Sequence, residues 1–231
     1  MAILGCKVMS IGVITDTIYR VRLVPEMPVY FKAGQYLMIV MNEDDKRPFS
    51  LASPPFQKEY LELHIGASAL NVHTMEVIDR FTKKKEIIVD IPYGNAWLRT
   101  QSKRPLLLIA GGTGFSYIQS ILLTALEQKL DRNILVYWGV REISYLYNQN
   151  ELKSLSQQYP NLHVILVVEH ATHEWHGRTG MVLDAVLQDF ATLTDYDIYI
   201  AGHFEMAKNA CKRFCIECGA QKEHIFGDAF Y

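Results

Sequence analysis

The chain has 231 residues, of which 49% are hydrophobic, with 23 Lys and Arg against 25 Asp and Glu and a formal net charge of −2. The hydrophobic content suits a packed globular protein of one large or two small domains and excludes a disordered one. The near-neutral charge lacks the basic field that attracts nucleic acid or anionic lipid, so the expected partner is a small molecule.

The sequence opens without a charged leader before a long apolar stretch, and no later run approaches about 18 apolar residues. A cytoplasmic protein without a membrane span is therefore expected. The four cysteines are Cys6 and a group at Cys211, Cys215 and Cys218. This spacing is unlike the framework of a small secreted scaffold, so disulfides are not expected.

The first part of the chain, up to about residue 95, alternates short β-branched segments with polar turns. This pattern predicts an antiparallel sheet that closes into a small barrel. One helix is expected over residues 72–81. The predicted strands are residues 8–14, 18–24, 36–41, 60–65 and 87–91.

After the polar segment 99–104 the rhythm changes to apolar strands separated by helix-length segments. Such a pattern is typical of a parallel sheet covered by helices on both faces, which is a nucleotide-binding architecture. We therefore predict an α/β domain over residues 100–231, after a barrel domain over residues 1–99. Its predicted strands are residues 106–110, 134–138, 164–168 and 198–201.

A glycine-rich turn follows the first strand of this second half. Gly111, Gly112, Thr113 and Gly114 lead directly into a segment with helical apolar spacing that begins at Phe115. Glycines allow backbone amides to approach a ligand closely, and a helix N-terminus favours a pyrophosphate. A plain strand-to-helix turn is the alternative, but the position at the carboxyl end of a parallel strand favours binding. The turn has neither the usual dinucleotide fingerprint nor a P-loop lysine.

Six segments in this order resemble the ferredoxin–NADP reductase superfamily and, within it, the free-flavin reductases of enteric and luminous bacteria. The resemblance covers nearly the whole chain. It implies a flavin-binding barrel, a C-terminal NAD(P)H-binding domain, and an isoalloxazine ring held between them. The segments are AGQYL (33–37), RPFSLAS (47–53), HIGAS (64–68), IPYG (91–94), AGGTGFS (110–116) and FGDAF (226–230).

The activity implied by this resemblance is that of an NAD(P)H-dependent flavin reductase. NADH or NADPH would give hydride to free riboflavin, FMN or FAD, and reduced flavin would leave for a luciferase or a monooxygenase. The flavin is expected to be a substrate because no insertion that could bind the adenylate half of FAD is recognisable. The sequence does not decide the preferred flavin, the choice between NADH and NADPH, the downstream user or the oligomeric state.

In the family, an Arg-x-x-Ser motif lies along the flavin, and here Arg47 and Ser50 carry it. The resemblance implies that Arg47 neutralises a flavin phosphate or donates to the polar edge of the ring, and that Ser50 is catalytic, with its hydroxyl beside N5. Without the resemblance, they would be a solvated turn charge and a strand-end residue. The other cofactor-binding candidates lie on the same strands and turns: Pro48, Phe49, His64, Ile65, Gly66, Ala67, Gly111, Gly112, Thr113, Gly114, Phe115 and Gly202.

His64 alternates with Tyr60 and Glu62, so it is expected to point away from the barrel interior. An exposed, uninvolved imidazole and a direct flavin contact are equally compatible with this pattern. Ala201 stands where relatives carry Cys before Gly202, which removes any thiol role. His203 replaces an Arg of close relatives, and the coenzyme preference is open for that reason.

Several other features have ordinary explanations. His170, His173 and His176 could ligate a metal but fall in a predicted loop, and no metal is expected. The cysteine group fits a packed helix better than an iron–sulfur site. Phe230 and Tyr231 could cover a flavin ring or cap the last strand.

Two other functions remain open. One is a reductase component that holds its flavin tightly and passes electrons to an oxygenase or haem protein. The other is a flavin carrier or scaffold without catalysis, which the glycine turn disfavours because a carrier needs no nicotinamide site.

Overall fold

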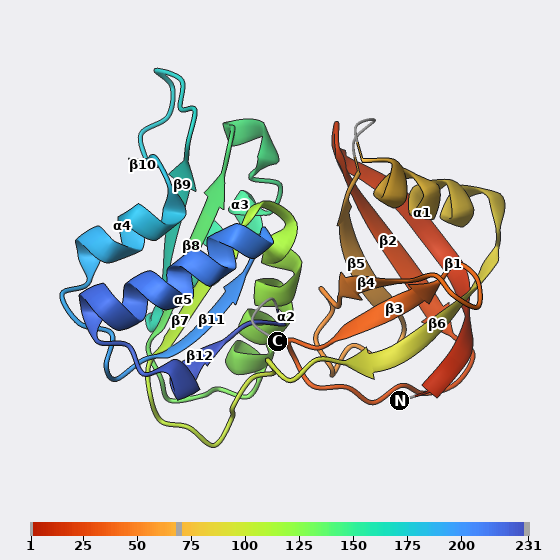
Figure 1. Cartoon of the computed structure of the whole chain (residues 1–231), viewed down its shortest axis with the longest axis horizontal. Coiled ribbons are helices and arrows are strands. Elements are labelled where there is room, and N and C mark those ends of the chain that lie inside the picture. Colours follow the sequence, from red (N-terminus) through yellow and green to blue (C-terminus); the bar gives the residue numbers. More distant parts are fainter. Residues whose placement is uncertain (1, 68–70, 229–231) are drawn as a thin grey trace.

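A computed structural model of the chain describes residues 2–67 and 71–228. Within these ranges the chain forms two six-stranded sheets, the first antiparallel and the second parallel (Figure 1). The part built on the first sheet is called the barrel lobe here, and the part built on the second is called the parallel lobe. The predicted fold class is confirmed.

The barrel lobe curves its sheet until the two edge strands approach each other. The backbone N–H of Ala52, just after β4, donates to the carbonyl of Glu62 on β5 at 2.8 Å. Helix α1, Val72–Lys83, covers one end of the barrel and buries Val77, Ile78 and Phe81. In the order β4-β3-β6-β1-β2-β5, the strands are β1 Ala2–Thr15, β2 Ile18–Pro25, β3 Tyr36–Val40, β4 Lys46–Ser50, β5 Leu61–Gly66 and β6 Glu86–Tyr93.

Two features of this lobe differ from the sequence expectation. Strand β4 was not predicted, because Lys46, Arg47 and Pro48 lack an apolar alternation; pairing with β3 makes it a strand. Strand β1 begins at Ala2 rather than at residue 8, because residues 2–7 pair with β6. The helix predicted at 72–81 is present as α1.

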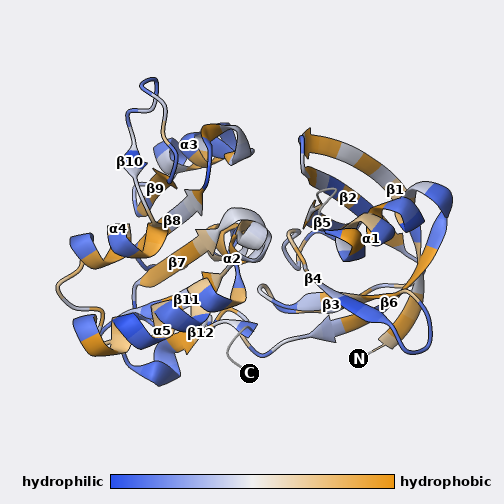
Figure 2. Cartoon of the chain, turned by 45° about the horizontal axis from the view of Figure 1, so that its top comes forward, coloured by the Kyte–Doolittle hydropathy of each residue, from blue (hydrophilic) through white to orange (hydrophobic). Residues whose placement is uncertain are grey.

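The parallel lobe places its first strand near the middle of the sheet. Helices α2 and α3 pack on one face, and α4 and α5 on the other, as the predicted two-sided cover requires. Figure 2 shows its central strands as largely hydrophobic. In the order β10-β9-β8-β7-β11-β12, the strands are β7 Leu106–Gly111, β8 Ile134–Val140, β9 Leu162–Val168, β10 Arg178–Thr179, β11 Asp197–Ala201 and β12 Ile225–Phe226. The helices are α2 Phe115–Glu127, α3 Gln149–Gln158, α4 Val182–Asp189 and α5 Phe204–Cys218.

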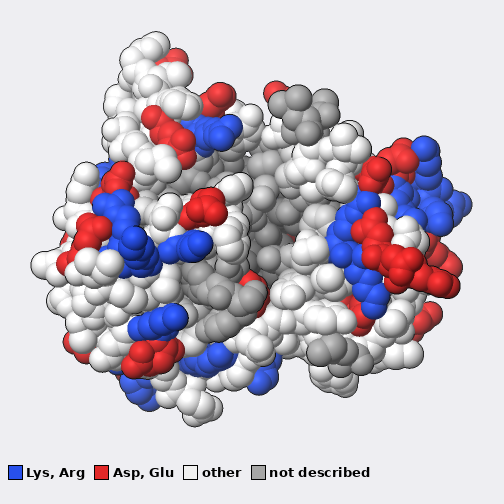
Figure 3. Space-filling model, viewed as in Figure 1, with Lys and Arg blue, Asp and Glu red and all other residues white. Residues whose placement is uncertain are grey.

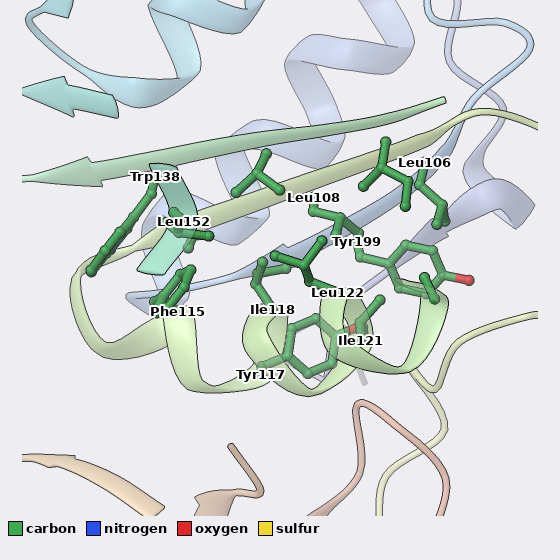
Figure 4. Packing of buried hydrophobic residues seen from close by; sticks show 14 of the residues in the cluster. Leu106, Leu108, Phe115, Tyr117, Ile118, Ile121, Leu122, Trp138, Leu152 and Tyr199 are labelled. Carbon is green, nitrogen blue, oxygen red and sulfur yellow. The ribbon is translucent and has the colours of Figure 1, made fainter. Parts of the chain in front are cut away.

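Helix α2 is buried on nearly all sides because it lies between its own sheet and the barrel lobe (Figure 1). Toward the sheet, it contributes Phe115, Ile118 and Leu122 to the core shown in Figure 4. Toward the barrel, Ser120 Oγ donates to the carbonyl of Ser53 at 2.9 Å. The two lobes are therefore joined by hydrogen-bonded, buried surface.

In the described part of the chain, every helix is too short or too polar to cross a membrane.

Candidate active site

The glycine turn lies where the parallel sheet reverses its strand order. Strands β7 and β11 are neighbours, and from them the sheet grows in opposite directions, so the turns that follow them flank a topological switch point. Ligands of open α/β sheets bind in the crevice at such a point. A Cβ built on Gly114 would lie 2.4 Å from the carbonyl oxygen of Ala201. The two turns are thus packed backbone against backbone.

The outer side of the turn is open. Gly112 has φ of +54°, and a Cβ built on it would meet nothing within 4 Å. Its carbonyl accepts a hydrogen bond from Trp138 Nε1 at 3.0 Å, which anchors the turn to β8. Helix α2 begins just beyond, at Phe115, with no acidic residue in its first turn. A helix N-terminus has unpaired N–H groups and a positive dipole end, which fit an anionic pyrophosphate.

The end of β5 brings the barrel lobe against this turn. A Cβ built on Gly66 would lie 3.1 Å from Thr113 Cγ2, so the glycine allows a close approach that a side chain would obstruct. Gly66 and Thr113 therefore lie where β5, predicted to bind flavin, meets the glycine turn, predicted to bind NAD(P)H.

Ser50 ends β4 and is half-buried, paired in register with Tyr36 of β3. Tyr36 stacks on Tyr93, with ring centroids 5.8 Å apart. Asp228 lies against the same corner, where its Oδ1 accepts the backbone N–H of Asn95 at 3.2 Å. Burial raises the pKa of the Asp228 carboxyl. Asp228 belongs to the motif segment 226–230, but no sequence pattern predicts a role for it.

Arg47 is already satisfied by protein groups. Its Nη2 lies 2.6 Å from Asp45 Oδ2 and 2.7 Å from Glu76 Oε2, and its Nη1 donates to the carbonyl of His73 at the start of α1. Hydrogen bonds from the guanidinium to Asp45 and Glu76 raise its pKa. A flavin phosphate would have to compete with two carboxylates for this side chain.

His64 lies on the outer face of β5, as its alternation predicts, but it is not exposed. Its side chain is 0% exposed, because the parallel lobe covers it. Nε2 lies 3.0 Å from Glu62 Oε1, and Nδ1 lies 3.1 Å from the hydroxyl of Tyr147. The interpretation of an exposed imidazole is wrong, and both ring nitrogens lie within hydrogen-bond distance of protein groups.

The remaining candidates differ in which of their atoms a ligand could contact. Ile65, Ala67 and Phe115 have buried side chains, so their backbone alone could face a ligand. Pro48 is exposed, whereas Phe49 packs against the barrel core.

The residues considered for other roles lie apart from this region. His170, His173 and His176 are exposed, and the described residues contain no group of three side chains arranged to hold a metal. Cys218 is buried at the end of α5, as the packing interpretation expects. Phe230 and Tyr231 lie outside the described residues.

The buried pair Glu62 and His64 predicts a loss of stability in acid. Burial lowers the pKa of His64 below 6.5 despite its bond to Glu62. The contribution of neutral His64 to the free energy of unfolding is therefore complete above pH 6.5 and is lost as the pH falls below 6.5. Burial opposes ionisation of Glu62, but hydrogen bonds from His64 and Arg22 lower its pKa from 4.5 to about 2, so its contribution is lost below pH 4.5.

Urea unfolding should therefore give a free energy that falls from pH 7 to pH 5, with a shallower slope in His64→Gln. The control is His163→Gln on β9, where the side chain is exposed. Equal slopes in wild type and His64→Gln would contradict this assignment.

Comparison with known proteins identifies the family. A model described as the oxidoreductase NAD-binding domain matches residues 108–212. An NAD(P)H-flavin reductase of Vibrio harveyi is 48% identical over 230 residues, covering 97% of this chain and 97% of the relative. The chain belongs to the NAD(P)H-flavin reductase family. A second member, from Aliivibrio fischeri, is also 48% identical and covers 98% of each chain.

Solved structures share the expected two-domain fold with this member of the NAD(P)H-flavin reductase family. The Amycolatopsis cytochrome P450 reductase GcoB matches with a TM-score of 0.89 at 25% identity, over 98% of this chain and 69% of that one. A Neisseria gonorrhoeae ferredoxin NADP+ reductase with bound FAD and NADP matches with a TM-score of 0.78 at 17% identity, over 94% and 92%. The latter likeness concerns the fold alone, and the predicted resemblance is confirmed.

Proposed function

We propose that the protein transfers hydride from NADH or NADPH to a flavin that binds and leaves as a substrate. The close approach of Gly66 to Thr113 at the switch point carries this proposal. It brings the end of the flavin strand to the turn that would hold the nicotinamide nucleotide. The 48% identity to NAD(P)H-flavin reductases supports the same reaction.

In this proposal, residues 1–99 bind flavin and residues 100–231 bind NAD(P)H. Backbone amides of Gly111 to Gly114 hold the pyrophosphate. Gly202 lets the second turn pack closely on the first, because a Cβ there would lie 2.7 Å from Met206 Cε and 3.2 Å from the backbone N of Gly111. The hydroxyl of Ser50 donates a hydrogen bond to the flavin near N5, the atom that accepts hydride. When bound, the nicotinamide supplies a hydride and the flavin ring accepts it, a transfer that depends on ring placement and shelter from water.

Because the side chain of Arg47 already bonds to protein groups, the site should recognise the flavin ring rather than a flavin phosphate. Two carboxylates and a backbone carbonyl already occupy the guanidinium. Riboflavin should accordingly be reduced at least as well as FMN or FAD. A strong preference for FMN or FAD would count against this part of the proposal.

The first test follows NADH and NADPH oxidation at 340 nm with and without each flavin, after recording the visible spectrum of the purified protein. A colourless protein that needs added flavin supports the proposal. A yellow protein that needs a protein acceptor supports the reductase-component alternative. That alternative draws on a 31% identical relative, the reductase component of the Pseudomonas putida naphthalene 1,2-dioxygenase system. No oxidation at all would favour the carrier.

Ser50→Ala should lower turnover with flavin by about tenfold or more, because removing one hydrogen-bond donor aimed at a reacting centre can cost about 10²–10³-fold in kcat. The matched control is Ser10→Ala on the exposed face of β1. Steady-state rates at saturating NAD(P)H measure the effect. Unchanged turnover in Ser50→Ala would remove Ser50 from the site.

A luciferase or a monooxygenase remains the proposed recipient of the reduced flavin, and a cytoplasmic location remains the expectation from the sequence. Neither bears on the hydride-transfer test above.

A further inference from the structure

Two consecutive residues of the parallel lobe reach across to the barrel. Tyr147 and Asn148 lie between the short 3-10 turn Ile143–Tyr145 and α3. The hydroxyl of Tyr147 is 3.1 Å from His64 Nδ1, and Asn148 Oδ1 accepts from Arg20 Nη2 at 3.2 Å. These residues, together with Glu62, are called the interlobe network: Arg20, Glu62, His64, Tyr147 and Asn148.

The hydrogen bonds of this network have a fixed direction. Glu62 is ionised, with its pKa lowered to about 2, and accepts from Arg22 Nε at 2.7 Å. A carboxylate can only accept, so neutral His64 must carry its proton on Nε2 and donate it to Glu62. Nδ1 is then an acceptor, and the Tyr147 hydroxyl donates to it. Each member thus holds the next in one orientation.

On the parallel side, the network ends against the glycine turn. The ring of Tyr147 meets that of Trp138 edge-on, with centroids 5.0 Å apart, and that of Phe115 at 6.0 Å. Phe115 and Trp138 are stacked at 4.1 Å (Figure 4), and Trp138 donates to the carbonyl of Gly112. A shift of Tyr147 would therefore move the packing that supports the turn.

On the barrel side, Glu62 and His64 lie on β5 itself. His64 is two residues before Gly66, where a Cβ would lie 3.1 Å from Thr113 Cγ2. A second connection runs from Asn148 Nδ2 to Gln119 Oε1 at 2.6 Å, and from Gln119 Nε2 to the carbonyl of Ala52 at 3.4 Å. Hydrogen bonds therefore connect both β5 and the segment after β4 to residues that pack behind the glycine turn.

In the view of Figure 3, the visible Lys, Arg, Asp and Glu side chains are spread over the front of the parallel lobe and gather on the outer flank of the barrel lobe. The interlobe network contains charged groups too, because Arg20 Nε lies 3.7 Å from Glu62 Oε1. Directed hydrogen bonds between such groups help to specify one relative position of the lobes.

We propose that Tyr147 and His64 are positioning residues, whose hydrogen bond sets the distance between β5, on the flavin side, and the glycine turn 111–114, on the NAD(P)H side. This inference rests on the proposed function. A displacement of about 1 Å at a distance from the chemistry can cost as much as about 100-fold in rate. Tyr147→Phe removes only the hydroxyl and keeps the ring that packs on Trp138.

The experiment measures the single-turnover rate of riboflavin reduction by NAD(P)H, with hydrogen or deuterium at C4, together with both KM values and the Tm. Tyr147→Phe and His64→Gln should each lower the hydride-transfer rate about tenfold, with KM values changed less than about threefold. The double variant should be no slower than the slower single variant, because both substitutions remove one shared bond. The deuterium isotope effect should be retained or increased.

The matched control is Tyr137→Phe, which deletes a hydroxyl that donates to Asp189 Oδ2 at 2.8 Å within the parallel lobe. It should lower the Tm by a similar amount and leave hydride transfer unchanged. The inference is overturned if Tyr147→Phe transfers hydride within twofold of wild type, or if Tyr137→Phe slows the transfer equally. A wild type that reduces no flavin would overturn the proposed function itself, and the inference with it.

Discussion

Gly114→Ala is expected to lower kcat/KM for NAD(P)H by about 100-fold. Gly114 has φ of −55°, which an alanine adopts freely, so the effect is steric rather than conformational. The added Cβ would lie 2.4 Å from the carbonyl oxygen of Ala201 and 2.7 Å from the backbone N of Gly202. Backbone cannot rotate aside like a side chain, so the two turns at the switch point must separate and distort the nucleotide site.

Steady-state kinetics with NADH and NADPH at saturating riboflavin measure this loss, and circular dichroism checks that the fold is kept. The control is Gly12→Ala on β1, where a Cβ would meet nothing within 4 Å. That variant should behave as wild type. Should Gly114→Ala keep kcat/KM within twofold, the packed turns would not be the nucleotide site.

The second large effect concerns the opposite end of the same sheet. Asp197→Asn should lower the free energy of unfolding by about 3–5 kcal/mol, because it leaves a buried arginine without its counter-charge. Asp197 begins β11 and its side chain is 1% exposed; its Oδ2 lies 2.5 Å from Nη2 of Arg132, which is 0% exposed. Its Oδ1 lies 3.0 Å from Nδ1 of His224.

Urea unfolding measures this difference, and the Tm should fall by roughly 10 °C. The matched control is Asp184→Asn, which breaks an ion pair to Arg213 whose two side chains are 51% and 39% exposed. An exposed pair should contribute less than about 1 kcal/mol. Equal losses in the two variants would show that burial of Asp197 and Arg132 has no special energetic weight.

The sequence determined the elements whose signal is local. Continuous apolar runs predicted β7, β8, β9 and β11, because strands covered on both faces need no polar side. The glycine turn 111–114 was visible as well, since its position at the carboxyl end of a buried parallel strand favoured binding over a plain strand-to-helix turn. The motif resemblance then indicated the family to which the chain belongs.

The tertiary structure alone decided which polar side chains are covered and by what. Alternation placed His64 on the outer face of β5, but periodicity within one strand carries no information about a second lobe that packs on that face. Tyr147 had no signal, because its partner His64 is 83 residues away along the chain. Arg47 looked free for a phosphate until β4 and α1 placed Asp45 and Glu76 beside it. Contacts between distant segments depend on how the lobes pack, and local residue patterns do not encode that packing.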